Sequence, residues 1–272
     1  MPQGTELAAT WGSHKQRHDP GAETDVQTGP MAPNGPQLSV VMPAYNEEAG
    51  LARNVVLLAA RLAQLGVIFE ILIVDDASMD RTGAIADGLA AADRRVRAFH
   101  HPANRGIGGG FVSGVAAATG EWLILIPADL ALDLAELGKY LEAARDADVI
   151  VGVRSDRSDY SGYRLLVSWL NIRLIQILFG MKERQFNYIS MYRLAVLRRM
   201  RIEYWRSAFF HAETIIKAKA LGYRLAEVEI SYVPRTSGQP TGARPKLLIR
   251  TVRDMLRFWI RWELRGPVAG VR

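Results

Sequence analysis

Two adjacent carboxylates are the most informative polar residues of this chain. Asp75 and Asp76 end the apolar run EILIVDD at residues 70–76. Neighbouring like charges repel unless hydrogen-bond donors stabilise both, and a nucleoside offers such donors in its base N–H groups and ribose hydroxyls. We therefore expect a nucleoside to bind here. A structural role, in which Asp76 or Ser78 caps the following helix, is compatible with this function.

Polar residues also follow other apolar runs. The turn PAYNE at residues 43–47 joins an apolar run to a helix-like segment, where Asn46 can cap the helix and Glu47 can stabilise its first turn. Asn104 and Arg105 precede a glycine-rich run at 106–110. Such a run suits a loop that approaches a phosphate, although glycine-rich loops before helices are common without that duty.

These residues need a scaffold that gathers them at one edge. Short apolar runs alternate with segments rich in Ala and Leu, which indicates a mostly parallel sheet with crossover helices. In such sheets ligands bind at the carboxyl ends of the strands. The expected strands are 38–43, 70–76, 96–101, 121–129 and 148–154, and the expected helices are 47–65, 82–92, 110–118 and 134–144. The sheet edge would bring together Tyr45, Asp75, Asp76, Asn104 and Asp129.

The pattern changes after about residue 156. A long helix-like segment is followed by a polar turn at 182–193, a helix at 211–221 and a strand at 226–234. The final segment, 246–265, has apolar residues at helical spacing and basic residues largely elsewhere, which predicts a basic amphipathic helix. Its apolar face either packs on the domain or contacts a membrane. The apolar positions are Leu248, Val252, Met255, Trp259 and Trp262.

Composition excludes several classes of protein. The chain has 272 residues, 49% of them hydrophobic, which suffices for the core of one enzyme-sized domain. The absence of cysteine excludes disulfide frameworks, thiolate nucleophiles and cysteine zinc sites. A net charge of +6 favours anionic partners, but the basic residues form no recognisable nucleic-acid motif, so we expect no nucleic-acid partner.

Two segments lie outside the expected core or membrane classes. Residues 1–36 are expected to form a disordered tail, and the interrupted apolar stretch 163–179 is too short to span a membrane.

Three segments, PAYNEE, VDDASMDRT and NRGIGGGFVSGVAAATGEWLILIPADLALD, occur in this order and resemble the nucleotide-binding half of family 2 glycosyltransferases. The resemblance covers residues 38–260 and points to the polyprenyl-phosphate sugar synthases, which are dolichyl-phosphate mannosyltransferase-like. It implies a GT-A fold of the α/β class, with a Rossmann-like, mostly parallel central sheet flanked by helices, then acceptor-side helices and the basic amphipathic terminal helix. The expected divisions are the tail 1–36 and one domain, 37–265, composed of a nucleotide-sugar-binding half at 37–153, an acceptor-side half at 154–245 and the helix at 246–265.

The resemblance also implies a donor site and a metal. The family holds Mg²⁺ or Mn²⁺ with an Asp-x-Asp motif, where this chain has Pro127-Ala128-Asp129. Because Mg²⁺ is often held by one or two carboxylates together with substrate phosphates, Asp129 is expected to bind the metal. Asp133 could help, but it is expected to act as an acid in the first turn of a helix. The donor-binding residues implied by the resemblance are Pro43, Ala44, Tyr45, Asn46, Glu47, Asp75, Asp76, Asn104, Arg105, Gly106, Ala128 and Asp129.

In the second half, the resemblance implies residues that bind the acceptor or a phosphate. They are Arg154, Arg164 and Arg235, and the guanidinium fork of arginine suits phosphate. Arg235 lies in PRTSGQPTGAR at 234–244, where the usual Ser-Lys after Arg-x-x-Gly is not preserved. Further matches to the synthases are Gly152, Asn187, Tyr192, Arg193 and Glu213.

The expected activity is an inverting, metal-assisted transfer of a sugar from a UDP- or GDP-sugar to a polyprenyl phosphate, with Asp129, Glu213 and Arg235 as catalytic candidates. The acceptor oxygen is already an anion near neutral pH, so it needs no protein base. A first alternative is transfer to a hydroxyl of a soluble glycan or natural product, for which Glu213 would be the general base. A second is noncatalytic nucleotide-sugar binding. The expected location is the cytoplasm, with peripheral contact to the inner face of the cell membrane.

Overall fold

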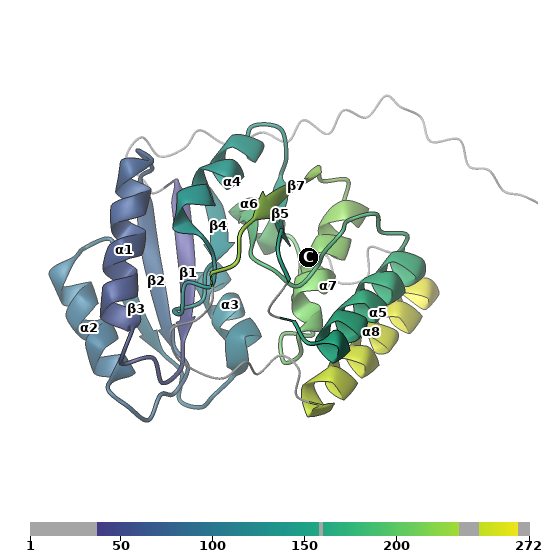
Figure 1. Cartoon of the computed structure of the whole chain (residues 1–272), viewed down its shortest axis with the longest axis horizontal. Helices are drawn as coiled ribbons and strands as arrows, with labels where there is room; N and C mark the ends of the chain where they lie inside the picture. The colour runs from purple at the N-terminus through teal and green to yellow at the C-terminus, as the bar shows by residue number, and fades with distance from the viewer. Residues whose placement is uncertain (1–36, 158–159, 234–244, 266–272) are drawn as a thin grey trace, which may run out of the picture. The chain divides into compact units, whose positions relative to one another are not determined.

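The computed structural model of the protein describes residues 37–157, 160–233 and 245–265 (Figure 1). All of them belong to one compact unit, Asn34–Arg272. The predicted tail at 1–36 lies outside the described residues. No helix in the described ranges combines the length and the hydropathy needed to cross a bilayer.

A seven-stranded sheet forms the centre of this unit, in the order β3-β2-β1-β4-β6-β5-β7. Neighbouring strands are parallel except where β6 pairs with β4 and β5. The prediction of a mostly parallel sheet flanked by helices is therefore confirmed. The strands are β1 Leu38–Ala44, β2 Phe69–Asp75, β3 Val96–His100, β4 Trp122–Leu125, β5 Val149–Arg154, β6 Ser190–Arg193 and β7 Leu225–Ile230.

The sequence prediction missed strand β6, which lies inside the segment 182–193 that is predicted to be a polar turn. Its three buried residues, Ser190, Met191 and Tyr192, add an antiparallel strand between β4 and β5. A strand of four residues beside a polar stretch is too short to show an alternating pattern. Its place in the sheet depends on pairing with residues far away in the sequence.

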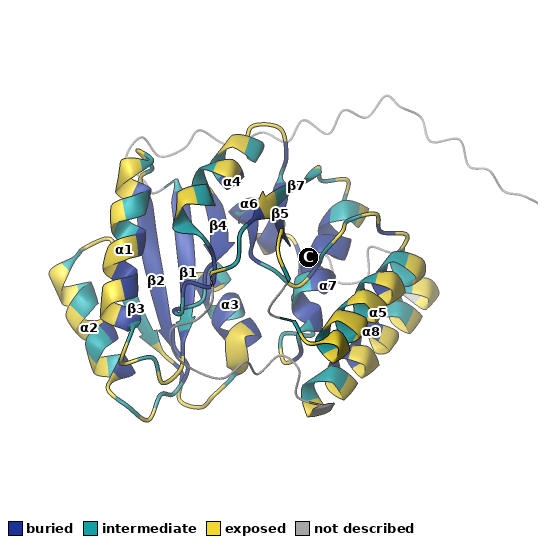
Figure 2. Cartoon of the chain, in the orientation of Figure 1, coloured by how far each residue is buried: buried dark blue, intermediate teal, exposed yellow. Residues whose placement is uncertain are grey.

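Helices cover both faces of the sheet, and two apolar clusters lie between the layers. One cluster joins α1 Leu51–Gln64, α2 Thr82–Ala92 and α4 Gly138–Ala143 to one face. The other joins α3 Gly106–Ala117, α6 Leu194–Arg198 and α7 Phe209–Ala220 to the opposite face, together with α5 Gly162–Phe179 and α8 Pro245–Arg265. A short 3-10 helix, η1 Leu134–Leu137, precedes α4. Figure 2 shows the central strands buried, the edge strands β3 and β7 partly exposed over most of their length, and the outer faces of the helices exposed.

The terminal helix α8 forms at the predicted place, and two residues of its predicted apolar face pack on the protein. Met255 is fully buried, and Trp262 packs against Phe179 of α5 and Phe258 of α8, with ring centroids 6.3 and 5.2 Å away. Arg261 anchors the same end of the helix, because its Nη2 lies 2.7 and 2.6 Å from the carboxylate oxygens of Glu203. Met255 and Trp262 therefore pack on the domain, whereas Val252 of the same predicted face is 41% exposed, and membrane contact stays a prediction.

Candidate active site

The turn after β1 is held by the loop after β2. The backbone N–H of Asn46 donates to Ser78 Oγ at 3.0 Å, while the Asn46 side chain accepts from Met79 N at 2.9 Å. The backbone N–H of Glu47 donates to Thr82 Oγ1 at 2.7 Å. Asn46 has a left-handed backbone, with φ of 53°, and α1 begins only at Leu51. The sequence suggested that Asn46 caps the helix, but α1 begins too late for this role. Asn46 instead connects two loops of the predicted donor edge.

Asp75 is buried at the end of β2 and is oriented by two neighbours. Its Oδ1 accepts from Ser78 N at 3.1 Å, and its Oδ2 lies 3.1 Å from His100 Nδ1. Burial opposes ionisation, but these hydrogen bonds outweigh it and lower the pKa of Asp75. His100 is also 2.9 Å from Asp87, and its two carboxylate neighbours raise the pKa of His100. Asp75 therefore remains an anion near neutral pH.

Asp76 organises the loop that leads into α3. Its Oδ1 accepts from Arg105 N at 2.8 Å and lies 2.7 Å from His101 Nδ1, while its Oδ2 accepts from Gly106 N at 2.7 Å. The side chain of Asn104 donates to the Asp76 carbonyl at 3.3 Å. The donors that stabilise the paired carboxylates are thus groups of the protein itself. His100 and His101 are among these donors, and nucleoside binding by Asp75 and Asp76 stays a prediction.

The glycines of α3 serve packing. Gly106 has a left-handed backbone, with φ of 72°, at the start of the helix. A side chain at Gly108 would overlap the carbonyl of Trp205, and one at Gly114 would overlap the side chain of Val41 on β1. Small residues let α3 approach the sheet and the 205 loop closely. The expectation that residues 106–110 form a loop open to phosphate is therefore not supported beyond Gly106, because this face is filled by protein.

Asp129 lies on a turn beside the end of β1. The chain after β4 continues along β1, with Ala128 N donating to Pro43 O at 3.3 Å, and Asn54 Nδ2 donates to Ala128 O at 2.8 Å. A left-handed residue, Leu130 with φ of 48°, then turns the chain, and its N–H donates to Pro127 O at 3.0 Å. Asn54 was not a sequence candidate, yet it fixes this turn from α1.

Asp129 is a partly exposed residue, and its carboxylate has the right chemistry for Mg²⁺ or Mn²⁺, which prefer oxygen ligands. Across the described ranges, no group of three or more His, Cys, Asp or Glu residues could hold a metal ion. Asp133 caps η1, because its Oδ1 accepts from Ala135 N at 2.8 Å, and it does not lie in the first turn as predicted. Asp129 therefore fits a metal only together with oxygens of a bound diphosphate and water.

The acceptor-side arginines gather around Tyr160. The guanidinium carbon of Arg154, at the end of β5, lies 4.8 Å from the Tyr160 ring centre and 3.4 Å from that of Tyr232. The guanidinium of Arg164, on α5, lies 4.1 Å from the Tyr160 ring centre. Two of the three predicted phosphate-binding arginines are thus brought together. The third, Arg235, lies outside the described residues.

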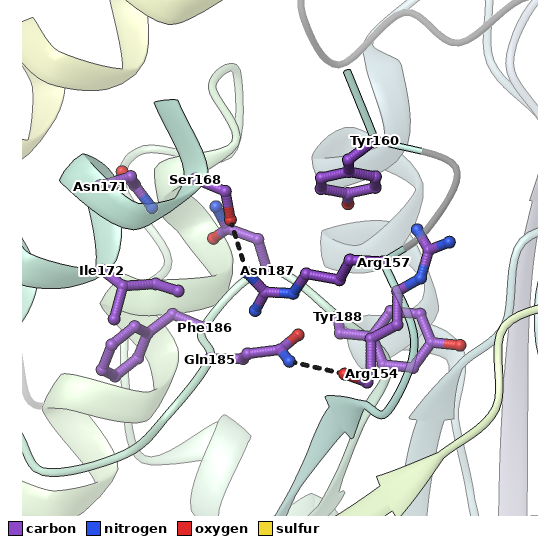
Figure 3. Close-up of a pocket in the computed structure, with 10 residues that line it drawn as sticks. All are labelled: Arg154, Arg157, Tyr160, Ser168, Asn171, Ile172, Gln185, Phe186, Asn187 and Tyr188. Carbon is purple, nitrogen blue, oxygen red and sulfur yellow. Dashed lines mark hydrogen bonds between the residues drawn. The ribbon is translucent and has the colours of Figure 1, made fainter. Parts of the chain in front are cut away.

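A small polar pocket opens between these elements (Figure 3). It has a volume of about 50 Å³, and Arg157 extends into it with Nη1 3.2 Å from Ser168 Oγ on α5. Sequence analysis missed Arg157, whose only signal was a second arginine shortly after Gly152-x-Arg154. The lining residues are Arg154, Arg157, Tyr160, Ser168, Asn171, Ile172, Gln185, Phe186, Asn187 and Tyr188.

A larger, mainly apolar cavity of about 480 Å³ adjoins the polar pocket between α5, α7 and α8. The two share Tyr160, Ser168, Asn171 and Asn187. We refer to them as the polar pocket and the apolar cavity. His211 lines the apolar cavity, and burial lowers the pKa of this histidine to about 4, so its ring is neutral at neutral pH.

The polar pocket is connected to the loop that carries Asp129. Tyr188 lines the pocket, and its hydroxyl donates to the carbonyl of Ala131 at 3.1 Å. Ala131 stands two residues after Asp129. The hydrogen bond therefore ties the predicted metal-binding turn to the arginine-bearing pocket.

Glu213 does not have the geometry of a general base. It is fully buried on α7, and its two oxygens accept from the backbone N–H groups of Glu203 and Tyr204, both at 2.9 Å. Lys217 Nζ also donates to it at 2.7 Å. Burial raises the pKa of Glu213, and these donors oppose the increase. The carboxylate has no path to an acceptor hydroxyl, so the structure supports a role in holding the 203–204 loop on α7.

Comparisons with known proteins place these features among sugar transferases. A sequence model described as glycosyl transferase family 2 matches residues 39–206. The chain is 29% identical to undecaprenyl-phosphate mannosyltransferase of Micrococcus luteus, over 85% of this chain and 96% of that protein. It is 28% identical to glycosyltransferase AglD of Haloferax volcanii, over 90% of this chain but only 40% of that protein. It is 29% identical to undecaprenyl-phosphate 4-deoxy-4-formamido-L-arabinose transferase of Pseudomonas aeruginosa, over 78% of this chain and 62% of that protein.

Solved structures share the fold. Glucosyl-3-phosphoglycerate synthase from Mycobacterium tuberculosis, in complex with Mn²⁺, UDP and phosphoglyceric acid, has a TM-score of 0.65 and 17% identity. The match covers 82% of this chain and 78% of that one. The same synthase has also been solved with Mg²⁺ and UDP, with a TM-score of 0.63. At this identity the likeness establishes the fold alone.

Proposed function

The chain belongs to glycosyl transferase family 2, and from this premise we propose that it transfers a sugar from a UDP- or GDP-sugar to a polyprenyl phosphate, with inversion at the anomeric carbon. One observation carries the choice of acceptor. A polar pocket that holds Arg154 and Arg157 adjoins a mainly apolar cavity. A polyprenyl phosphate has the same two parts, an anionic head and an apolar chain.

The relatives support this choice. The two named for undecaprenyl phosphate, from Micrococcus and Pseudomonas, are each 29% identical to this chain, and the first matches it over 96% of its own length. The arginines suit a phosphate because a guanidinium offers several N–H donors in a planar fork. Tyr160 holds Arg154 and Arg164 in place by stacking contacts.

In the proposed mechanism the protein acts mainly by positioning. The nucleoside diphosphate binds at the edge formed by the 43–47 turn, the 75–78 loop and the Ala128-Asp129 turn. Asp129 would hold Mg²⁺ or Mn²⁺, which supplies positive charge to the diphosphate leaving group when bound. The phosphate oxygen of the acceptor attacks the anomeric carbon directly, while Arg154 and Arg157 hold its phosphate. Because the nucleophile is already ionised, the reaction needs no general base. The burial of Glu213 is therefore compatible with the proposed transfer.

The test is radiolabelled sugar transfer from a panel of UDP- and GDP-sugars into polyprenyl phosphate, with and without Mg²⁺ or Mn²⁺. We expect label in the lipid with one of these donors, lost on chelation and in Asp129→Ala. Asp146→Ala, which removes an exposed carboxylate away from the described pockets, is the matched control and should retain activity. Donor hydrolysis without lipid product would favour a soluble acceptor, and donor binding without any turnover would favour a noncatalytic protein.

The proposed location follows from the acceptor. A polyprenyl phosphate resides in a membrane, so we place the enzyme at the inner face of the cell membrane, with its donor site towards the cytoplasm. Fractionation of cells into membrane and soluble pools tests this placement. Recovery of the protein only from the soluble pool at low salt would contradict it.

A further inference from the structure

Two neighbouring helices leave apolar side chains exposed along their length. On α8 these residues recur every three or four positions, which places them on one side of the helix. On α5 a second series recurs at similar spacing, with Trp169 and Leu170 adjacent. Together we call them the α5–α8 surface, and Figure 2 shows both helices largely exposed on their outer sides. Its members are Tyr163, Leu166, Trp169, Leu170, Leu174 and Ile177 on α5, and Ile249, Val252, Leu256, Ile260 and Leu264 on α8.

This surface shares only Val252 with the apolar face that sequence analysis singled out. Met255 and Trp262 of that face pack on the protein. Ile249, Ile260 and Leu264, in contrast, are 70%, 50% and 79% exposed. Helix α8 therefore carries exposed apolar residues beside the apolar residues that the fold buries. A contiguous exposed apolar surface of this kind marks an interaction site.

The charges on the same helices identify the partner. Helix α8 carries six Lys and Arg residues and two acidic residues, and α5 carries two arginines and no acid. Arg257 is exposed between the apolar positions of α8, whereas the exposed Arg253 and Arg261 pair with Asp254 and Glu203. Apolar side chains flanked by basic ones fit a surface that is apolar inside and anionic outside, as a bilayer with anionic headgroups is.

The apolar cavity opens into this surface. Leu170 and Leu174 of α5 and Val252 of α8 line the cavity and are also exposed members of the α5–α8 surface. An apolar chain that leaves the cavity here would enter water unless a bilayer covered the opening. We therefore propose that the α5–α8 surface lies against an anionic lipid surface, so that the chain of the acceptor passes from the bilayer into the cavity. This last part rests on the proposed function, whereas the docking itself does not.

The experiment is flotation of the full-length protein with vesicles of equal parts phosphatidylglycerol and phosphatidylcholine, and with phosphatidylcholine alone. We expect strong binding to the anionic vesicles and weak binding to the neutral ones. Ile260→Glu should weaken binding to anionic vesicles about tenfold or more, because it puts a carboxylate at the lipid contact. Ile68→Glu is the matched control, since Ile68 is 51% exposed and lies outside α5 and α8. It should bind like the wild type.

A charge variant tests the electrostatic part without altering an apolar contact. Arg257→Gln should weaken anionic-vesicle binding about fivefold, whereas Arg145→Gln, at an exposed arginine between α4 and β5, should not. No vesicle binding by the wild type, or equal losses in Ile260→Glu and Ile68→Glu, would overturn the proposal. Concentration-dependent dimerisation that Ile260→Glu abolishes, without vesicle binding, would assign the surface to a second copy of the chain and also overturn it.

The proposed membrane docking and the proposed transfer reaction can be tested and disproved separately. Vesicle binding is measured without a donor sugar, and transfer can be measured with a short-chain prenyl phosphate that is soluble in water. Ile260→Glu should keep transfer to the soluble acceptor and lose transfer to a long-chain acceptor embedded in vesicles. Equal loss with both acceptors would show that the residue acts in the site and not in docking.

Discussion

The carboxylate of Asp76 holds the backbone N–H of Gly106 at 2.7 Å, across thirty residues of sequence. This contact joins the end of β2 to the first residue of α3, and the neighbouring N–H of Arg105 donates to the other oxygen. Asp76 is nearly inaccessible to water. The carboxylate that follows this strand therefore holds the loop that leads into α3.

We expect Asp76→Asn to lower the free energy of unfolding by about 2 kcal/mol, because two backbone donors lose an ionised acceptor. Urea unfolding measures this, with Asp146→Asn as the exposed control. Donor affinity should fall as well, since the 104–106 loop is no longer fixed. An Asp76→Asn protein as stable as the wild type would contradict the structural role.

Glu213→Gln should destabilise the protein and retain transfer activity when the folded fraction is taken into account. The amide cannot accept from Glu203 N, Tyr204 N and Lys217 Nζ as a carboxylate does, and Lys217 is itself buried. The expected loss is about 3 kcal/mol, the lower end for breaking a buried ion pair. Thermal unfolding and transfer assays below the unfolding temperature separate the two effects. Complete loss of transfer in a folded variant would restore Glu213 as a catalytic base.

Stability should fall in acid through Glu70. Burial raises the pKa of Glu70, but hydrogen bonds from Ser39, Thr119 and Arg97 outweigh this, so its pKa is below the ordinary value of 4.5. The unfolded chain then takes up the proton more readily, and the stability from Glu70 is present above pH 4.5 and lost as the pH falls through the lowered value. Urea unfolding from pH 7 to 3 should show a steeper loss in the wild type than in Glu70→Gln. Parallel curves would refute this.

Arg157→Gln should raise the KM for polyprenyl phosphate about tenfold or more and leave the KM for the donor unchanged, because its guanidinium lies in the polar pocket and not at the donor edge. Steady-state kinetics with each substrate varied in turn measure both constants. Arg145→Gln, exposed and away from both pockets, controls for the loss of one positive charge. A rise in the donor KM alone would show that Arg157 does not bind the phosphate of the acceptor.

Sequence by itself determined the fold class and the positions of most elements. The apolar runs before Asp75 and Asp129 gave parallel strands in the expected places, because a strand buried on both faces needs an unbroken apolar run. The terminal helix was also evident, since α8 has a strong helical periodicity. These signals are local, so no knowledge of distant contacts was needed.

Tertiary structure alone decided how the residues are used. Strand β6 exists because it pairs with β4 and β5, and Glu213 is inaccessible because the 203–204 loop covers it. Likewise, only packing shows that Met255 faces the protein while Ile260 faces outward. Helical spacing identifies the sides of a helix, but which side is buried depends on α5 and α7, which are distant in sequence. Burial and hydrogen-bond partners are properties of the folded chain, and they assign the roles that residue types leave open.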